Sequence, residues 1–158
     1  MRTIEKTIFT FDELSEPAKE RAREWYRRGL EYPWWDEVQS SLRAFCDEFG
    51  VSVLDYSIGD CRRAFIKTDA SPSTFRGLKL SQFDREAMPS GFCFDCALRY
   101  AFADEWKRTS DPFYAFGIAL ESFLREVEND IEHQYSDEAV EESIEANGYE
   151  FDEGGHLA

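Results

Sequence analysis

The chain has 158 residues, 42% of them hydrophobic and 16% aromatic, which is too rich in core-forming side chains for a disordered chain despite a formal charge of −15. This length fits a single domain. No run of eighteen apolar residues occurs, and the first ten residues alternate polar with apolar side chains, so we expect a soluble cytoplasmic protein without a membrane span or a signal peptide.

The negative charge is concentrated at one end of the sequence. Residues 121–158 hold thirteen of the 33 acidic residues and a single basic one, Arg125, whereas residues 1–120 hold 20 acidic and 17 basic residues. A charge field of this kind bears on association, solubility and partners, and it says little about the fold.

The first third of the chain predicts a strand followed by two neighbouring helices. Residues 3–11 are rich in Thr, Ile and Phe with polar residues between them, as in an opening strand. Ser15 is placed to cap a helix that has Pro17 in its first turn, and a second helix begins near Trp34 and stops at Gly50. The outer face of the first helix is basic: Lys19, Arg21, Arg23, Arg27 and Arg28.

The middle of the chain predicts a β-hairpin and a long loop. Residues 51–58 and 61–68 have strand character and are separated by Gly59 and Asp60, a pair that suits a tight turn. Residues 69–90 contain Ser, Pro and Gly without a clear period, and we expect a loop with a short strand or a turn of helix near residues 78–88. Function and disorder both remain open for this loop.

Three further helices are predicted toward the C-terminus. One spans about residues 92–108, one begins at Asp111 and Pro112 and runs to about residue 134, and one is capped by Ser136 and terminated by Asn147 and Gly148. The elements predict an α+β fold, in which about five helices pack with a small antiparallel sheet made of the N-terminal strand and the hairpin. We expect one domain over residues 1–158, with a strongly acidic helical part at residues 112–158.

Four cysteines are too few for a disulfide framework in a chain of this length. Cys93 and Cys96 form one C-x-x-C pair, but a structural zinc site needs about four ligands and no second pair exists. A thioredoxin-like redox site would need the pair at a strand-to-helix junction, whereas residues 91–98 suit the opening of an apolar helix. We therefore expect no metal, and we expect buried thiols at Cys46, Cys61, Cys93 and Cys96.

The two C-terminal helices separate apolar from acidic faces. On the longer helix, Glu121, Glu128 and Glu132 flank one side of an apolar stripe, and Glu126 and Asp130 flank the other. On the last helix, Val140 and Ile144 face inward. The outward arc of that helix is acidic throughout: Asp137, Glu138, Glu141, Glu142 and Glu145.

These acids have two principal interpretations. They can form a solvated face that keeps the protein soluble and pairs with the arginines of the first helix, or an anionic docking surface for a basic partner. Their density along the helices, about one per 4 Å, is comparable to that of the phosphates of one nucleic-acid strand. A calcium loop is disfavoured because residues 150–155 are too short and lack the closing Glu. The candidate partner-binding residues are Glu128, Glu132, Asp137, Glu138, Glu141, Glu142, Glu145, Glu150, Asp152 and Glu153.

Catalysis and direct nucleic-acid binding both lack support. The two histidines, His133 and His156, lie in the acidic end, and no glycine-rich phosphate loop or H-E-x-x-H motif occurs, so we expect no enzyme and no cofactor. Trp25 and Tyr26 lie among the arginines of the first helix, but a chain with a charge of −15 repels nucleic acid at long range.

Several segments resemble a family of small acidic proteins encoded by phages and prophages, most of unknown function and some described as antitoxin-like. They are FDELSEPAK and REWY at residues 11–26, WWD at residues 34–36, and YSDEAV and IEANGYEF at residues 135–151. The resemblance implies an anti-defence inhibitor, directed against CRISPR or restriction enzymes, that acts in the bacterial host cytoplasm. It would bind a basic, nucleic-acid-binding effector through an acidic surface that mimics nucleic acid. The alternative is an antitoxin or regulatory binding partner that masks a basic toxin or another protein, without catalysis.

Overall fold

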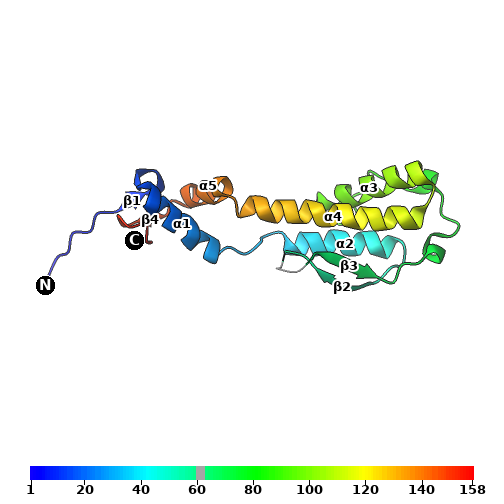
Figure 1. The fold of residues 1–158 in the computed structure, drawn as a ribbon, viewed down its shortest axis with the longest axis horizontal. Helices are drawn as coiled ribbons and strands as arrows, with labels where there is room; N and C mark the ends of the chain where they lie inside the picture. The colour runs from blue at the N-terminus through cyan, green and yellow to red at the C-terminus, as the bar shows by residue number, and fades with distance from the viewer. Residues whose placement is uncertain (60–62) are drawn as a thin grey trace. The chain divides into compact units, whose positions relative to one another are not determined.

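A computed structural model describes residues 1–59 and 63–158, and Figure 1 shows its elements in chain order. Five α-helices and two antiparallel sheets of two strands each occur in the described ranges, which confirms the predicted α+β class. The chain forms two compact units, residues 1–32 with 131–158 and residues 33–130, and each is described by itself. Within the described ranges, no helix combines the length and the apolarity that crossing a bilayer requires.

The first unit joins the two ends of the chain. Its strands β1 and β4 pair antiparallel, with Phe9 opposite Phe151 and Thr10 opposite Glu150. A short 3-10 turn, η1, leads from β1 toward the first helix. The elements are β1 (Phe9–Thr10), η1 (Phe11–Glu13), α1 (Glu16–Arg28), α5 (Asp137–Asn147) and β4 (Glu150–Phe151).

Small residues let α1 and α5 approach each other in this unit. Ala18 and Ala22 of α1 and Val140 and Ile144 of α5 are almost completely buried in one apolar cluster. Gly155 lies so close to α1 that a Cβ built on it would be 2.1 Å from the carbonyl oxygen of Ala18. The C-terminal turn therefore depends on a glycine at this position.

The second unit has a core of aromatic rings. Phe45 of α2 stacks on Phe116 of α4 with ring centroids 5.3 Å apart, and Phe102 of α3 packs edge-on against Phe45 at 5.7 Å. The hairpin of β2 and β3 belongs to the same unit, as does α4 up to Asp130. The elements are α2 (Trp35–Glu48), β2 (Val53–Ser57), β3 (Phe65–Thr68), η2 (Pro72–Phe75), η3 (Leu80–Gln82), α3 (Phe94–Thr109) and α4 (Pro112–Gln134).

Two buried charged residues of α3 hold the long loop that precedes it. The Asp95 carboxylate, 1% exposed, accepts the backbone N–H of Ser90 at 3.0 Å and the Ser90 hydroxyl at 2.7 Å. The Arg99 guanidinium, 2% exposed, donates to the carbonyl of Asp84 and pairs with Glu48. The loop therefore has a fixed path, with 3-10 turns η2 and η3. Of the short strand or turn of helix expected near residues 78–88, the structure has the turn of helix, η3.

The helices agree with the sequence prediction more closely than the strands do. Ser136 accepts the N–H of Ala139 and Asp111 accepts the N–H of Tyr114, which confirms both caps, and Gly148 ends α5 with a φ of 66°. Ser15 lies at the N-cap of α1 but makes no side-chain cap bond.

The predicted opening strand over residues 3–11 is shorter in the structure. It is reduced to Phe9–Thr10, and this strand pairs with β4 instead of the hairpin, so two small sheets replace the one that was expected. The pairing with β4 was not expected because β4 has only two residues and gives no strand signal in the sequence. The predicted turn at Gly59 and Asp60 reaches outside the described residues.

Candidate partner-binding site

Helix α5 presents its acids because its other side is fixed in the core. Val140 and Ile144 are both 0% exposed, and they lie one turn apart on the face that packs against α1. The Ser136 cap and the left-handed Gly148 fix where the helix begins and ends. The carboxylates on the opposite side are therefore held at defined positions on the first unit.

An arginine of α1 binds one of these acids directly. Arg23 donates from Nε to Oε1 of Glu141 at 2.7 Å, and its Nη2 lies 2.5 Å from the same oxygen. The Arg23 side chain is 13% exposed and also pairs with Glu20 at 2.8 Å. Burial acts to lower the pKa of Arg23, but the hydrogen bonds that its guanidinium donates to Glu20 and Glu141, with the charges of Glu141 and Asp137, outweigh it and raise this pKa.

A second arginine of α1 binds the first turn of α5. Arg27 pairs through Nη2 with the carboxylate of Asp137, and its Nε donates to the carbonyl of Tyr135 at 3.0 Å. Two of the five acids in the predicted outward arc, Asp137 and Glu141, are thus neutralised by α1. The prediction of a continuous arc of a single sign is wrong, because the basic face of α1 packs beside it, and the expected pairing with these arginines is confirmed for both acids.

The structure adds an acid that the sequence analysis did not assign to the site. Asp12 of η1 lies near Glu145 of α5, and its charge is the largest cause that raises the pKa of the Glu145 carboxyl. Desolvation, a hydrogen bond to Asp12 and the charge of Glu141 raise this pKa further, and only Lys19 lowers it. Asp12 precedes Glu145 by more than 130 residues, and no spacing in the sequence relates the two.

Four exposed carboxylates therefore define the remaining surface, which we call the acidic face: Asp12, Glu138, Glu142 and Glu145. The three glutamates follow at spacings of four and three residues, which places them on one side of α5. Within the described part of the chain, neither Glu138 nor Glu142 has an ion-pair partner. The whole first unit has sixteen acidic and seven basic residues, a formal charge of −9.

The other predicted site residues are not part of this face. Glu132, Glu150 and Glu153 are exposed in the first unit, and Glu128 belongs to the second unit. The Asp152 carboxylate organises the C-terminal turn, where it accepts the backbone N–H of Gly154 at 2.9 Å and of His156 at 3.0 Å. The hydrogen bond from His156 is the main cause that lowers the pKa of Asp152. This carboxylate is therefore engaged within the fold.

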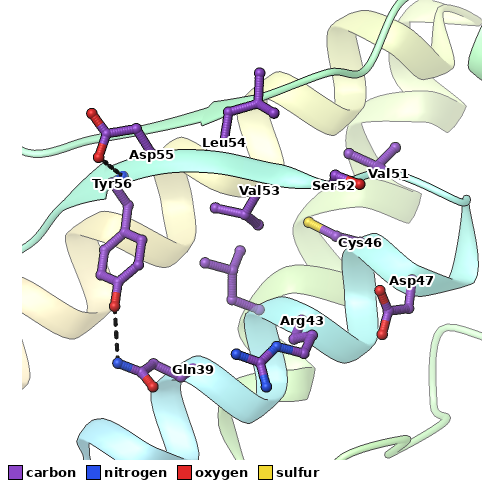
Figure 2. A pocket seen from close by; sticks show the side chains of 11 residues that line it. Gln39, Arg43, Cys46, Asp47, Val51, Ser52, Val53, Leu54, Asp55 and Tyr56 are labelled. Carbon is purple, nitrogen blue, oxygen red and sulfur yellow. Dashed lines mark hydrogen bonds between the residues drawn. The ribbon is translucent and has the colours of Figure 1, made fainter.

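The cysteines differ in their environment. Cys46 is buried beside a cavity of about 430 Å³ between α2 and β2, shown in Figure 2, and burial raises the pKa of its thiol to about 12. Cys93 is exposed at the N-cap of α3 and Cys96 is half-buried, so the expectation of a buried thiol is wrong for Cys93, which precedes the buried part of the helix. Cys61 lies outside the described residues. Among the residues described, no three His, Cys, Asp or Glu side chains are grouped to hold a metal ion.

Comparisons of the chain with protein-family models, with curated proteins and with solved structures find no match.

Proposed function

We propose that this protein is a binding protein without catalytic activity, whose acidic face engages the basic nucleic-acid-binding surface of a partner and occludes it. The chemistry of the face suits such a partner, because clustered carboxylates on an exposed helix attract lysine and arginine side chains and steer their approach. Together with the resemblance to phage-encoded proteins, it favours a host defence nuclease as the partner.

The gathering of four exposed carboxylates on the acidic face, with Asp12 near Glu145, is the observation that supports this proposal most strongly. Folding brings two carboxylates together at the surface and raises the pKa of Glu145, so the arrangement opposes folding at neutral pH. Glu138 and Glu142 add a second like-charge pair one helical turn apart. Such a surface lowers the stability of the free protein. Binding of a cationic partner would relieve the repulsion, and this accounts for the arrangement.

The spacing of the glutamates supports a partner that normally binds nucleic acid. Along the axis of α5, Glu138, Glu142 and Glu145 span about 10 Å at a rise of 1.5 Å per residue. Three charges over this length approach the density of a nucleic-acid strand, which has one phosphate per about 3.4 Å. A basic channel that accepts phosphates can therefore accept this row.

The test is capture of partners from a host lysate with two variants of equal charge. The first changes the acidic face: Asp12→Asn, Glu138→Gln, Glu142→Gln and Glu145→Gln. The second changes four other exposed acids by the same total charge: Glu31→Gln, Asp36→Asn, Asp47→Asn and Glu126→Gln. We expect the wild type and the second variant to retain a basic nucleic-acid-binding protein and the first variant to lose it. Equal retention by both variants would refute the proposal, and capture of a small basic toxin would favour the antitoxin alternative.

A further inference from the structure

The second unit has a strand edge that no strand of the described residues covers. Among the residues described, the sheet of this unit contains β2 and β3 alone, which pair with Tyr56 opposite Ile66 and Ser57 opposite Phe65. Asp69 donates its N–H to the carbonyl of Ser52 at 3.2 Å, at the end of this ladder. Because backbone groups alternate between the two edges of an antiparallel strand, those of Ile66 and Thr68 face away from β2.

A groove runs along that edge of β3 and is bounded on its other side by α4. It comprises two adjoining cavities of about 480 and 800 Å³ that share Ile66, Gly117, Leu120 and Glu121. Consecutive residues of β3, from Ile66 to Thr68, line it, and successive side chains of a strand point to opposite faces, so the groove follows the edge of the strand and not one face of the sheet. The α4 side is largely apolar, and a Cβ added at Gly117 would meet no atom within 4 Å.

The outer edge of β2 is protected in a way that the edge of β3 is not. Figure 2 shows the side chain of Asp55 accepting the backbone N–H of Tyr56, at 2.9 Å, and Gln39 donating to the Tyr56 hydroxyl, also at 2.9 Å. The first contact satisfies an outward amide of β2, and the second links β2 to α2. An added strand would have to displace the first contact, so the β3 edge is the better acceptor.

The chain also has a strand-forming segment that pairs with no strand of the described residues. Residues 1–8 have no secondary structure and every one of them is exposed, although residues 3–8 have the composition of a strand. Ile4 is 85% exposed and Ile8 is 46% exposed. These two side chains lie four residues apart and share one face of an extended chain. We call residues 1–8 the arm.

From these two unpaired features we infer that the arm of one copy of the protein adds as a strand to the β3 edge of a second copy. The arm supplies main-chain hydrogen bonds to Ile66 and Thr68, and it places Ile4 and Ile8 against the apolar side of α4. The two isoleucines are about 13 Å apart in an extended chain, and the part of α4 that lines the groove from Phe113 to Leu124 is about 17 Å long. Reciprocal exchange between two copies gives a closed dimer. This interaction is independent of the acidic face.

The mass of the full-length chain in solution, measured by sedimentation equilibrium, tests the inference. We expect a concentration-dependent dimer whose dissociation constant rises at least tenfold in the arm variant Ile4→Asp with Ile8→Asp and in the groove variant Gly117→Phe. The matched controls, Ile4→Val with Ile8→Val and Gly117→Ala, should dimerise like the wild type. The arm variant changes residues outside every helix and strand, so its effect cannot come from unfolding.

A cross-link locates the contact. One preparation has Ile4→Cys and the other has Thr68→Cys, both with Cys93→Ser to remove the native thiol that is exposed in the described residues, and the two are mixed and oxidised with diamide. We expect a disulfide-linked dimer that contains one chain of each kind. A monomer at the highest soluble concentration would overturn the inference. A dimer that the groove variant dissociates and the arm variant does not would also overturn it, because the edges of two β3 strands would then pair directly.

Discussion

Arg23 and Glu141 are 118 positions apart in the chain, yet two guanidinium nitrogens of Arg23 bind one carboxylate oxygen of Glu141 at 2.7 and 2.5 Å. The pair links α1 to α5 and joins the two ends of the sequence within the first unit. It also distinguishes the acids of α5 that form ion pairs with α1 from those that remain on the acidic face.

We predict that this pair stabilises the first unit measurably. In a double-mutant cycle with Arg23→Met and Glu141→Gln, the coupling energy from urea unfolding should be about 1 kcal/mol, since both side chains are partly buried and the contact is a charged hydrogen bond. The exposed pair of Arg28 and Glu24, 3.7 Å apart, is the control and should give about 0.3 kcal/mol. Equal couplings for the two pairs would contradict the prediction.

Substitution of Glu145 should stabilise the protein at neutral pH. Folding raises the pKa of this carboxyl, chiefly through the charge of Asp12, so the folded chain binds the proton more tightly than the unfolded chain. The contribution of Glu145 to stability is therefore present below its unfolded pKa and is lost as the pH rises through its folded pKa. We expect Glu145→Gln to raise the Tm at about pH 7 and to leave it unchanged at about pH 3, where the carboxyl is protonated in both states. A Tm difference that does not change with pH would argue against this repulsion.

Gly155→Ala should destabilise the first unit by several kcal/mol. Its φ of 81° disfavours a side chain, and the new methyl group would also collide with the backbone of Ala18. Gly77→Ala is a matched control, because Gly77 has a φ of 80° and open space around it, and it should cost only about 1 kcal/mol. Urea unfolding of the two variants separates the effect of the collision from the effect of the backbone strain. Similar losses in the free energy of unfolding would show that the contact of Gly155 with α1 does not affect stability.

The loop before α3 should lose its fixed path when Asp95 is replaced. Asp95→Ala leaves the N–H and the hydroxyl of Ser90 without their buried acceptor, which should cost about 1–3 kcal/mol. We expect faster cleavage within residues 76–92 in limited proteolysis, whereas Lys107→Ala, at an exposed position of the same helix, should leave the cleavage rate unchanged. An unchanged rate for Asp95→Ala would show that the loop is held by other contacts.

Local features of this fold are readable from the sequence, and distant contacts are not. The caps at Asp111 and Ser136 and the stop at Gly148 were predicted because each depends on neighbours within four residues. The pairing of β1 with β4 depends on chain ends that meet only after folding. The anchoring of the long loop by Arg99 had no signal either, since an arginine on a helix is usually exposed.

For the acidic face, too, local features could be predicted and distant contacts could not. Helical spacing predicted which side of α5 is acidic, and burial of Val140 and Ile144 confirms that side. Spacing could not show that Arg23 and Arg27 form ion pairs with two of these acids. It also could not show that Asp12 adds a carboxylate to the face. The composition of the face therefore follows from the packing of α1 and η1 beside α5.

The most direct test of the acidic face is competition with nucleic acid for the captured partner. The partner is loaded with a fluorescently labelled duplex, and the protein is added at increasing salt while the anisotropy of the duplex is recorded. We expect the wild type to release the duplex, with an affinity that falls as salt rises, and the variant with Asp12→Asn, Glu138→Gln, Glu142→Gln and Glu145→Gln to need at least tenfold more protein. A partner that holds the duplex and the protein at the same time, or equal release by the wild type and the variant, would contradict the account.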